Sequence, residues 1–486
     1  MYAGLDFGTS NCLIGIWKNN NPTLLPLEGK NTRLPSALYT SHQSINAKQI
    51  DETALQERIA SAKIKHNSEI KKARKENKNI KNLSDTELEN IERGMMRREI
   101  EERIKTHNKT QPMTEVLYAD SEISFGEDAI LHHIEDSQSG YFVKSPKSFL
   151  GADISKSHIE LFSEIITRML AHIKNNAENS IQTEINDIVL GRPVNFHGTR
   201  GEEGNTQAIN IIQRSAIAAG FKNIEFQMEP MAAALDFERS LSKDFTVLVL
   251  DAGGGTTDCS MVRLGPSYIK QNDRTDSILG HTGDRIGGTD LDIKLAVKKM
   301  MPHFGKDTLL ENGLPIPVTL FWDAVTTNDV NIQTQFLSPR TQREIASYLA
   351  QAVDKEKFQR FQILQQERLM NQLNRSAEQA KINLSDQQST SLPLDYIEQD
   401  FVIPVSRHDF RESIERELDA FVSLMKEAET QAGTKPDLIY VTGGTAKSPV
   451  IEEWIRSSYR DIDIVVGDAF GSVVSGLTTW AHRIYK

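Results

Sequence analysis

Two patterns of apolar and polar positions alternate along the chain. Short apolar runs rich in β-branched residues, such as 245–250, predict buried strands. Apolar residues three or four positions apart predict amphipathic helices. The expected strands are 1–17 (two strands around a hairpin), 35–39, 185–191, 224–229, 401–405 and 438–442, and the expected helices are 159–177, 207–219, 346–384, 410–431 and 450–457. This alternation predicts an α/β fold with helices on both faces of its sheets. No pattern assigns elements to residues 300–345.

The strand at 245–250 ends in an unusual polar turn. It runs into Asp251, then the glycines 253–255, and a second acid follows at Asp258. Glycines let the backbone approach a bound group closely, because they carry no Cβ. Successive peptide N–H groups in such a turn suit phosphate oxygens. The two acids would repel phosphate unless a cation lay between them, so this turn predicts a Mg²⁺-nucleotide.

A similar turn follows Asp6 near the N-terminus. Aligned on Gly-Thr, the two copies match Thr9 with Thr256 and Asn11 with Asp258, and the later copy has two extra residues in its glycine run. Two such units about half a chain apart predict an internal duplication, in which each half offers one hairpin to a shared phosphate. A structural turn without a ligand is the alternative for any single copy.

Composition and charge narrow the class of protein. The chain has 486 residues, 38% of them hydrophobic and 25% charged, which is typical of a soluble protein of several domains. The net charge of −11 makes nucleic acid an unlikely main partner. We expect no signal peptide and no membrane span, since no apolar run is long enough to cross a bilayer. Two cysteines, Cys12 and Cys259, fit a reducing cytoplasm, and we expect both to be buried thiols rather than redox switches.

Residues 46–110 differ from the rest of the chain. Between Lys63 and Lys109 there are 14 Lys or Arg and 9 Asp or Glu, so this part is positive while the remainder is negative. Its few apolar residues recur at helical spacing, and Ser84 to Glu87 has the pattern of a capping box. We predict a projecting helical insertion. A solvated helical hairpin and a docking arm for a partner or for RNA are the two alternatives.

Further candidates lie at strand ends and in turns. Glu229 ends a strand before a helix that begins with small residues, a place where α/β folds often hold their chemistry. Lys147 is a candidate for a phosphate-directed lysine. The glycines at 443–444 follow another strand, and the helix after them could offer N–H groups to an anion or a sugar hydroxyl.

Together these segments resemble the nucleotide-binding domain of the seventy-kilodalton heat-shock chaperones (DnaK-type), which belongs to the actin-like ATPase superfamily. The matching segments are 4–11, 228–234, 250–260, 285–292 and 441–449. They occur in the family's order over nearly the whole chain, and the layout is most similar to truncated, YegD-like members. The resemblance implies a duplicated actin-like ATPase fold, two lobes around a nucleotide cleft, and binding of ATP/ADP with Mg²⁺.

The resemblance also implies roles for individual residues. Asp6 and Asp251 would hold waters of the Mg²⁺, with Asp258 close to the metal. Lys147 would face the γ-phosphate and Glu229 would help to place the attacking water. The residues expected to act in catalysis are Asp6, Lys147, Glu229, Asp251 and Thr256. Those expected to bind the nucleotide are Gly8, Thr9, Ser10, Asn11, Gly253, Gly254, Gly255 and Thr256 at the phosphates, Glu378, Lys381 and Ser385 on the adenosine helix, Gly443, Gly444, Thr445 and Lys447 across the base, and Asp468 near the ribose.

The chain departs from the family's pattern in several places. Ile382 stands where the family has an arginine that stacks on adenine, and Gly191–Phe196 replaces Val-Pro-Ala-Tyr-Phe, which includes the usual domain-coupling proline. The insertion at 46–110 is foreign to the family. The sequence stops where the linker and the peptide-binding β-sandwich would begin, so we expect no peptide-binding domain. The expected domains are a first lobe at 1–199, a second lobe with the adenosine side at 200–476, and a tail at 477–486.

Three functions fit this pattern. The first is a slowly ATP-hydrolysing, chaperone-like protein whose cleft closure is felt by an unidentified partner. The second is a small-molecule kinase of the sugar-kinase type, since such kinases share these hairpins. The third is an interaction or filament protein that binds ATP without hydrolysing it. Stimulation of ATP consumption by sugars, and pelleting with and without ATP, would distinguish them.

Overall fold

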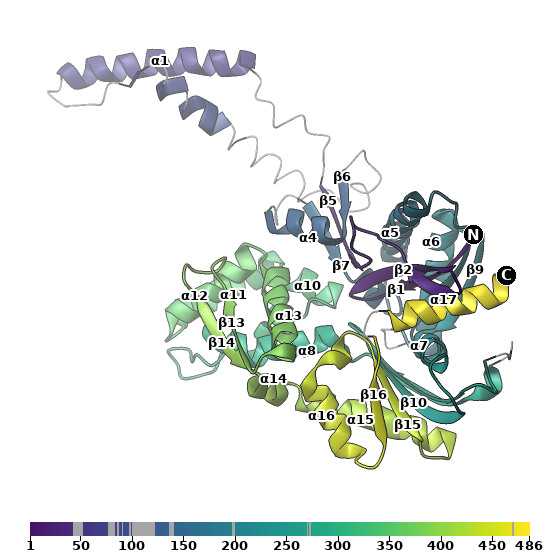
Figure 1. The fold of residues 1–486 in the computed structure, drawn as a ribbon. Coiled ribbons are helices and arrows are strands. Elements are labelled where there is room, and N and C mark those ends of the chain that lie inside the picture. Colours follow the sequence, from purple (N-terminus) through teal and green to yellow (C-terminus); the bar gives the residue numbers. More distant parts are fainter. Residues whose placement is uncertain are drawn as a thin grey trace.

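Two sheets of the same topology form the frame of the molecule (Figure 1). In the computed structural model, the first sheet consists of β1 (Tyr2–Phe7), β2 (Asn11–Lys18), β3 (Asn21–Leu24), β4 (Leu34–Pro35), β8 (Asp187–Arg192) and β9 (Asn223–Met228). The second sheet consists of β10 (Phe245–Ala252), β11 (Thr257–Leu264), β12 (Ile278–Asp284), β15 (Leu438–Thr442) and β16 (Asp463–Val466).

The strand orders are β3-β2-β1-β8-β9 and β12-β11-β10-β15-β16. In each sheet the first three strands are antiparallel and the last three are parallel. The sheets therefore confirm both the predicted α/β class and the predicted duplication.

Some of the chain lies outside this description. The structure describes all residues except 42–51, 76–82, 85–86, 90, 97–98, 100–121, 136–139, 197–199, 270, 272–273 and 469–470. The predicted insertion at 46–110 is therefore only partly covered. No helix among the described residues is long and apolar enough to cross a membrane.

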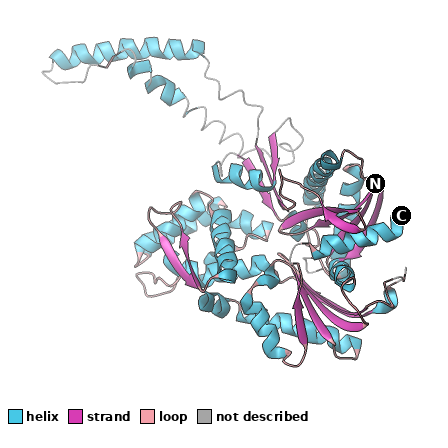
Figure 2. Ribbon diagram, viewed as in Figure 1, coloured by secondary structure: helices cyan, strands magenta, loops and turns pink. Residues whose placement is uncertain are grey.

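Helices cover both faces of each sheet (Figure 2). The outer face of the first sheet packs on α5 (Lys156–Ile181) and α6 (Glu202–Ala218), and the outer face of the second packs on α15 (Glu415–Ala432) and α16 (Pro449–Ser458). Between the sheets lie α7 (Glu229–Glu238) and α17 (Ser472–Tyr485). The chain thus forms two sheet-and-helix layers joined through a central pair of helices.

The central helices cross between the halves. α7 follows the first sheet but packs on β10 and β11 of the second, whereas α17 follows the second sheet but packs on β1 of the first. Small residues allow this close crossing, since a Cβ on Gly476 would overlap the backbone of Ala232. Small residues on both helices therefore allow the two halves to come into close contact.

Each half carries an additional unit outside its main sheet. In the first half a small sheet packs on a helix; its elements are β5 (Ala37–Ser41), β6 (Glu122–Phe125), β7 (Gly140–Lys144) and α4 (Gly126–Glu135). In the second half the unit is largely helical; its elements are α8 (Gly288–Leu295), α9 (Val318–Val325), α10 (Val330–Phe336), α11 (Pro339–Gln351), α12 (Lys355–Gln366), α13 (Met370–Asp386), α14 (Arg407–Ser413), β13 (Ser389–Pro393) and β14 (Val402–Ser406).

The helix predicted as continuous over 346–384 is divided into α11, α12 and α13. The first break is at Asp354, whose side chain accepts a hydrogen bond from the N–H of Lys357 and so starts a new helix. The second break is at Arg368, which has a φ of 56°. Helical spacing of apolar residues persists across both breaks, which is why the sequence alone does not show them.

The domain limits predicted from the sequence need correction at two places. The limit at 199/200 falls between β8 and β9, which are hydrogen-bonded neighbours in the first sheet. Residues 477–486, expected as a tail, lie mostly within α17, which packs on β1. The first limit lies before the first sheet is complete, and a linear division of the sequence cannot show that the chain returns to this sheet with α17.

The described part of the insertion is a helical arm. α1 (Glu52–Lys75) stands away from the two halves (Figure 1). Leu55 and Ile59 on α1 are buried, and ion pairs join Arg58 to Glu99 at 2.6 Å and Arg93 to Glu52 at 2.7 Å. The arm is therefore a helical hairpin held by a few apolar contacts and surface charge pairs.

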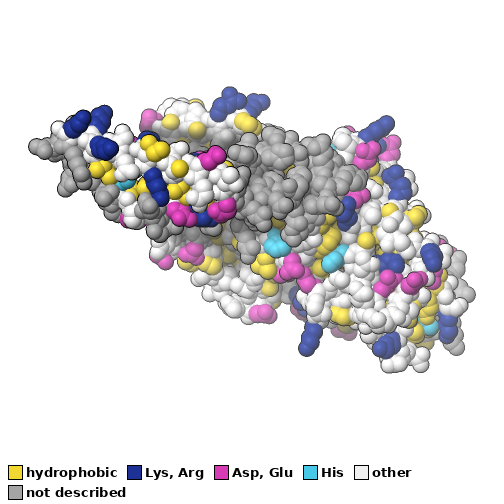
Figure 3. All heavy atoms as spheres, turned by 90° about the horizontal axis from the view of Figure 1, so that it is seen from above, with side chains coloured by type: hydrophobic (Ala, Val, Ile, Leu, Met, Phe, Trp, Pro, Cys, Tyr) yellow, Lys and Arg dark blue, Asp and Glu magenta, His cyan; other side chains and the backbone are white. Residues whose placement is uncertain are grey.

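Two details of the arm bear on the predictions. The capping box is confirmed, because the N–H of Ser84 donates to Glu87 at 2.8 Å and the N–H of Glu87 donates to Ser84 Oγ at 3.2 Å. Lys65, Lys71, Lys72 and Lys75 are exposed toward the far end of α1, where Figure 3 shows Lys and Arg side chains gathered. Docking through this end stays a prediction.

Candidate functional site

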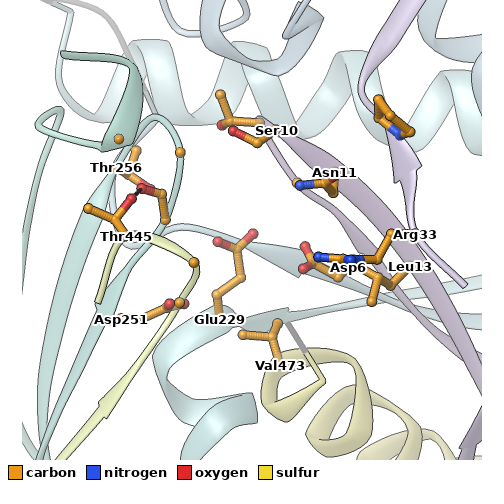
Figure 4. A pocket seen from close by; sticks show the side chains of 18 of the residues that line it. Asp6, Ser10, Asn11, Leu13, Arg33, Glu229, Asp251, Thr256, Thr445 and Val473 are labelled. Carbon is orange, nitrogen blue, oxygen red and sulfur yellow. Dashed lines mark hydrogen bonds between the residues drawn. The ribbon is translucent and has the colours of Figure 1, made fainter. Parts of the chain in front are cut away.

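The alternation of side chains along β1 and β10 sets the position of two acids. In β10, Val247 and Val249 pack in the core between the sheets, so Asp251 ends the same inward-facing row. In β1, Gly4 lies against Leu477 of α17, so Asp6, two residues later, also faces inward. Each inner strand therefore presents a carboxylate at its end, toward the space between the halves (Figure 4).

A pocket of about 380 Å³ occupies this space. Its lining brings together most of the predicted site residues, namely Asp6, Gly8, Thr9, Ser10, Asn11, Glu229, Asp251, Gly253, Gly254, Thr256, Glu378, Lys381, Gly443, Gly444 and Thr445. Six predicted residues are not in the lining: Lys147, Gly255, Asp258, Ser385, Lys447 and Asp468. What each residue binds stays a prediction.

The two hairpins have the same length, which corrects the sequence alignment. Asp6 pairs with Leu13, and Asp251 pairs with Asp258, seven positions on in each case. The N–H of Gly8 donates to the carbonyl of Asn11, and the N–H of Gly253 donates to that of Thr256. Asn11 therefore corresponds to Thr256, and the later copy has no extra residues. The alignment on Gly-Thr was wrong because strand register, not residue identity, determines the equivalent positions.

The hairpins approach each other closely across the pocket. A Cβ on Gly254 would lie 2.0 Å from Ser10 Oγ, and a Cβ on Gly255 would lie 2.8 Å from Thr9 Cγ2. Any larger residue at 254 or 255 would push the hairpins apart. The glycines of the second hairpin are therefore needed for the two turns to face one small ligand.

Neighbouring segments hold the second hairpin in shape. Its carbonyls accept hydrogen bonds from the N–H of Gly288 (2.9 Å, to Gly253), the N–H of Thr289 (2.8 Å, to Gly254) and Thr445 Oγ1 (2.7 Å, to Gly253). Two other segments, 285–292 and 441–449, thus hold this turn in its conformation. Both are among the segments in which the sequence resembles the heat-shock chaperones.

Lys147 lies behind the pocket rather than in its lining. Ser145 has a left-handed φ of 57°, and the 3₁₀ turn Pro146–Phe149 that follows directs Lys147 inward. Lys147 is 4% exposed, and its Nζ lies 2.5 Å from Glu229 Oε1. Burial lowers the pKa of Lys147, but Glu229 and Asp6 raise it by more, so the lysine stays charged. It therefore anchors Glu229, which does line the pocket.

Four carboxylates surround this one lysine. Burial, together with the charge of Glu229, raises the pKa of Asp6 to about 7 and that of Asp258 to about 7, and it raises the pKa of Asp251 well above its usual value. Carboxylate oxygens suit a hard cation such as Mg²⁺. No group of three or more metal-ligating side chains converges among the described residues.

The effect of crowding these carboxylates together can be tested by measuring the stability of a variant at Asp258. Replacing Asp258 with asparagine should stabilise the nucleotide-free protein at neutral pH, because it removes a buried charge while an amide oxygen can still accept from the N–H of Val194. Since the folded pKa is about 7 and the unfolded value is 3.8, the wild type loses stability relative to the variant as pH rises through this window. Thermal unfolding from pH 4 to 8 checks this.

The expected curves are specific. The melting temperatures of wild type and Asp258→Asn should coincide near pH 4 and separate by several degrees above pH 7. Asp284→Asn, an exposed acid one strand away on β12, should follow the wild type throughout. A difference in melting temperature between wild type and Asp258→Asn that does not change with pH would show that titration of Asp258 is not its cause.

On the side predicted to hold adenosine, α13 contributes one face to the pocket. Glu378 pairs with Lys144 of β7 at 2.7 Å, and Lys381 pairs with Asp292 of α8 at 2.8 Å. Ile382 lines the pocket and is 50% exposed, so it offers apolar surface there. Ser385, one turn further, hydrogen-bonds back to its own helix.

Sequence reasoning missed several lining residues, among them Leu13, Asn31, Arg33, Gly288 and Val473. Arg33 is brought to the first hairpin because β4 pairs with β2, with Pro35 opposite Asn11. Strand pairing of this kind has no local signal. Val473 comes from the start of α17, which packs on β1 of the first sheet.

Comparison with known proteins identifies the family. The model of the family described as "Hsp70 protein" matches residues 142–311 and 333–462, more than half of the chain. The chain belongs to the Hsp70 family. The two-lobed fold with twin hairpins is accordingly the Hsp70 type of actin-like ATPase fold.

Curated relatives of the Hsp70 type cover less of the chain. This chain is 30% identical over 227 residues to the "Chaperone protein HscA homolog" of Acinetobacter baumannii strain AYE. The match covers 41% of this chain and 34% of the relative. The corresponding protein of strain SDF is 29% identical over 228 residues, with the same shares. The match thus spans about a third of the length of these chaperones.

Proposed function

We propose that this Hsp70-family protein is a weak, Mg²⁺-dependent ATPase that binds ATP and ADP between its halves. One observation carries the proposal: two equivalent hairpins, one from each half, meet across a pocket and each follows an inward-facing acid, Asp6 or Asp251. Such turns suit phosphate groups. The carboxylates around them need a cation to balance their charge.

Different residues of the chain would have different roles in ATP hydrolysis. Backbone N–H groups of both hairpins would hold the phosphates, and Asp6 and Asp251 would hold the metal through water. Glu229, held by Lys147, would orient the attacking water. Mg²⁺, when bound, supplies positive charge to the phosphate oxygens. With no covalent step for the protein to perform, alignment and electrostatics would provide the rate enhancement.

The proposed output is mechanical. Ligand contacts to hairpins of both halves would favour the closed cleft, and a partner could sense the closure through the crossing helices α7 and α17. A chaperone role is supported by the family and by the names of the relatives. As a switch, the protein should turn over well below the ~10 s⁻¹ median of enzymes. Its partner or client would be another protein.

Nucleotide titration tests this function. Calorimetry with ATP and ADP, with and without Mg²⁺, should show one site per chain, and phosphate release should be slow and metal-dependent. Stimulation of ATP consumption by sugars would instead favour the kinase alternative. ATP-dependent pelleting without phosphate release would favour the filament alternative. Absence of nucleotide binding under all conditions would refute the proposal.

Ile382 gives a prediction on affinity. Replacing Ile382 with arginine would place a guanidinium against the base, where stacking adds about 0.5–1 kcal/mol at an exposed site. ADP should therefore bind roughly two- to fivefold more tightly. Calorimetry with ADP measures this change, and Ile217→Arg, an exposed position on α6, is the control. Unchanged affinity would mean that the base does not lie against residue 382.

A further inference from the structure

A second, larger cavity of about 450 Å³ lies beside the nucleotide pocket. Its walls come from β7 and α5 of the first half and from α10 and α13 of the second, which lie close together in Figure 1. Phe142, Lys144 and Asn371 also line a smaller cavity of about 190 Å³, which shares Ser10 and Ile382 with the nucleotide pocket. The three cavities therefore form a continuous series between the halves.

The chemistry of the large cavity differs from that of the nucleotide pocket. Phe142, Phe149, Leu161 and Phe162 form an apolar wall. Lys144 is the only Lys, Arg, Asp or Glu among the lining residues, and it is already paired with Glu378 at 2.7 Å. Gln333 and Asn371 add polar groups from the opposite half. A charged ligand would find no counter-charge here, whereas an uncharged ring would find matching walls.

We propose that this cavity binds a small, uncharged, ring-containing molecule, and that this binding is coupled to nucleotide binding. Its volume is within the range of small-molecule sites. The mixture of aromatic walls and a few polar groups is typical of such sites.

The coupling follows from the position of the walls. A ligand that contacts both Leu161 and Asn371 contacts both halves at once, so it binds best when the cleft is closed. The Lys144–Glu378 pair links the two sites, because Lys144 lines this cavity and Glu378 lines the nucleotide pocket. The coupling rests on the proposed nucleotide site, and by linkage each ligand must change the affinity of the other by the same factor.

Nile red, an uncharged fluorescent ring compound, is the probe for a test on the full chain. It should bind at one saturable site without nucleotide, and Mg²⁺-ADP should tighten it by about fivefold or more. Leu161→Trp, which fills the cavity from α5, and Asn371→Trp, which fills it from α13, should each remove this site. Leu309→Trp, at an exposed leucine outside the cavity, should leave it intact. Thermal unfolding shows which variants are folded.

The outcomes separate the site from the proposed function. Probe binding that survives in both folded tryptophan variants of the cavity would overturn the site. Probe and ADP binding that are independent of one another would overturn the coupling. Cavity-dependent probe binding in a protein that binds no nucleotide would sustain the site and refute the proposed function instead.

Discussion

Replacing Asp251 with asparagine is expected to lower Mg²⁺-dependent ATP hydrolysis at least about a hundredfold. Asp251 is 6% exposed, ends the inward-facing row of β10, and lies with Asp6, Asp258 and Glu229 around a single lysine. The amide keeps the shape of the side chain but removes the charge that would hold the metal's waters. Single-turnover phosphate release at saturating ATP measures the loss directly.

The control for this substitution is Asp463→Asn, an exposed acid at the start of β16 in the same sheet. It should hydrolyse ATP at the wild-type rate. Because burial raises the pKa of Asp251, its replacement should also leave the nucleotide-free fold intact or more stable. Full activity of Asp251→Asn would refute the assignment of the site.

Replacing Lys147 with alanine should have the second large effect, on both activity and stability. Without the lysine, Glu229, whose side chain is 12% exposed, stays beside other carboxylates with no cation, and loss of one partner of a buried ion pair typically costs about 3–5 kcal/mol. Turnover should fall about a hundredfold or more, because Glu229 is no longer held. Denaturant unfolding and phosphate release measure the two effects.

A double-mutant cycle separates the energy of the Lys147–Glu229 interaction from the effects of each residue's other surroundings. Glu229→Gln added to Lys147→Ala removes the unpaired charge, so the double variant should be more stable than Lys147→Ala alone. Lys156→Ala, at an exposed lysine that begins α5, is the matched control and should change neither quantity. If Lys147→Ala were as stable as the wild type, the ion pair would make no contribution to the stability of the fold.

The fold was predictable from the sequence where its signals are local. The apolar run before Asp251 and the glycines after it specify a strand and a turn, and the copy at Asp6 specifies the duplication. Register was not predictable in this way: residue identity aligned Thr9 with Thr256, whereas strand pairing aligns Asn11 with Thr256. Hydrogen-bond register is a property of two strands together, and neither strand alone reveals it.

In the candidate site, too, residues with a local sequence signal were predictable, and residues placed by distant contacts were not. Its glycines and acids could be found because each has a local chemical reason, and most of them meet in one pocket. Arg33 and Val473 were missed, since one is placed by the pairing of β4 and the other by the return of the last helix. The short helices α9 and α10, with 8 and 7 residues, gave no periodic signal over 300–345.

The return of α17 to β1 also bears on the order in which this protein folds. Gly4 on β1 is covered by Leu477 and Thr478 of α17, so the contact that closes this face of the first sheet joins residues that lie very far apart in the sequence. Contacts of long sequence separation form slowly, because the entropy of closing a long loop has to be lost first. This face of the first sheet, and the part of the pocket wall that Val473 provides, should therefore be completed late in folding.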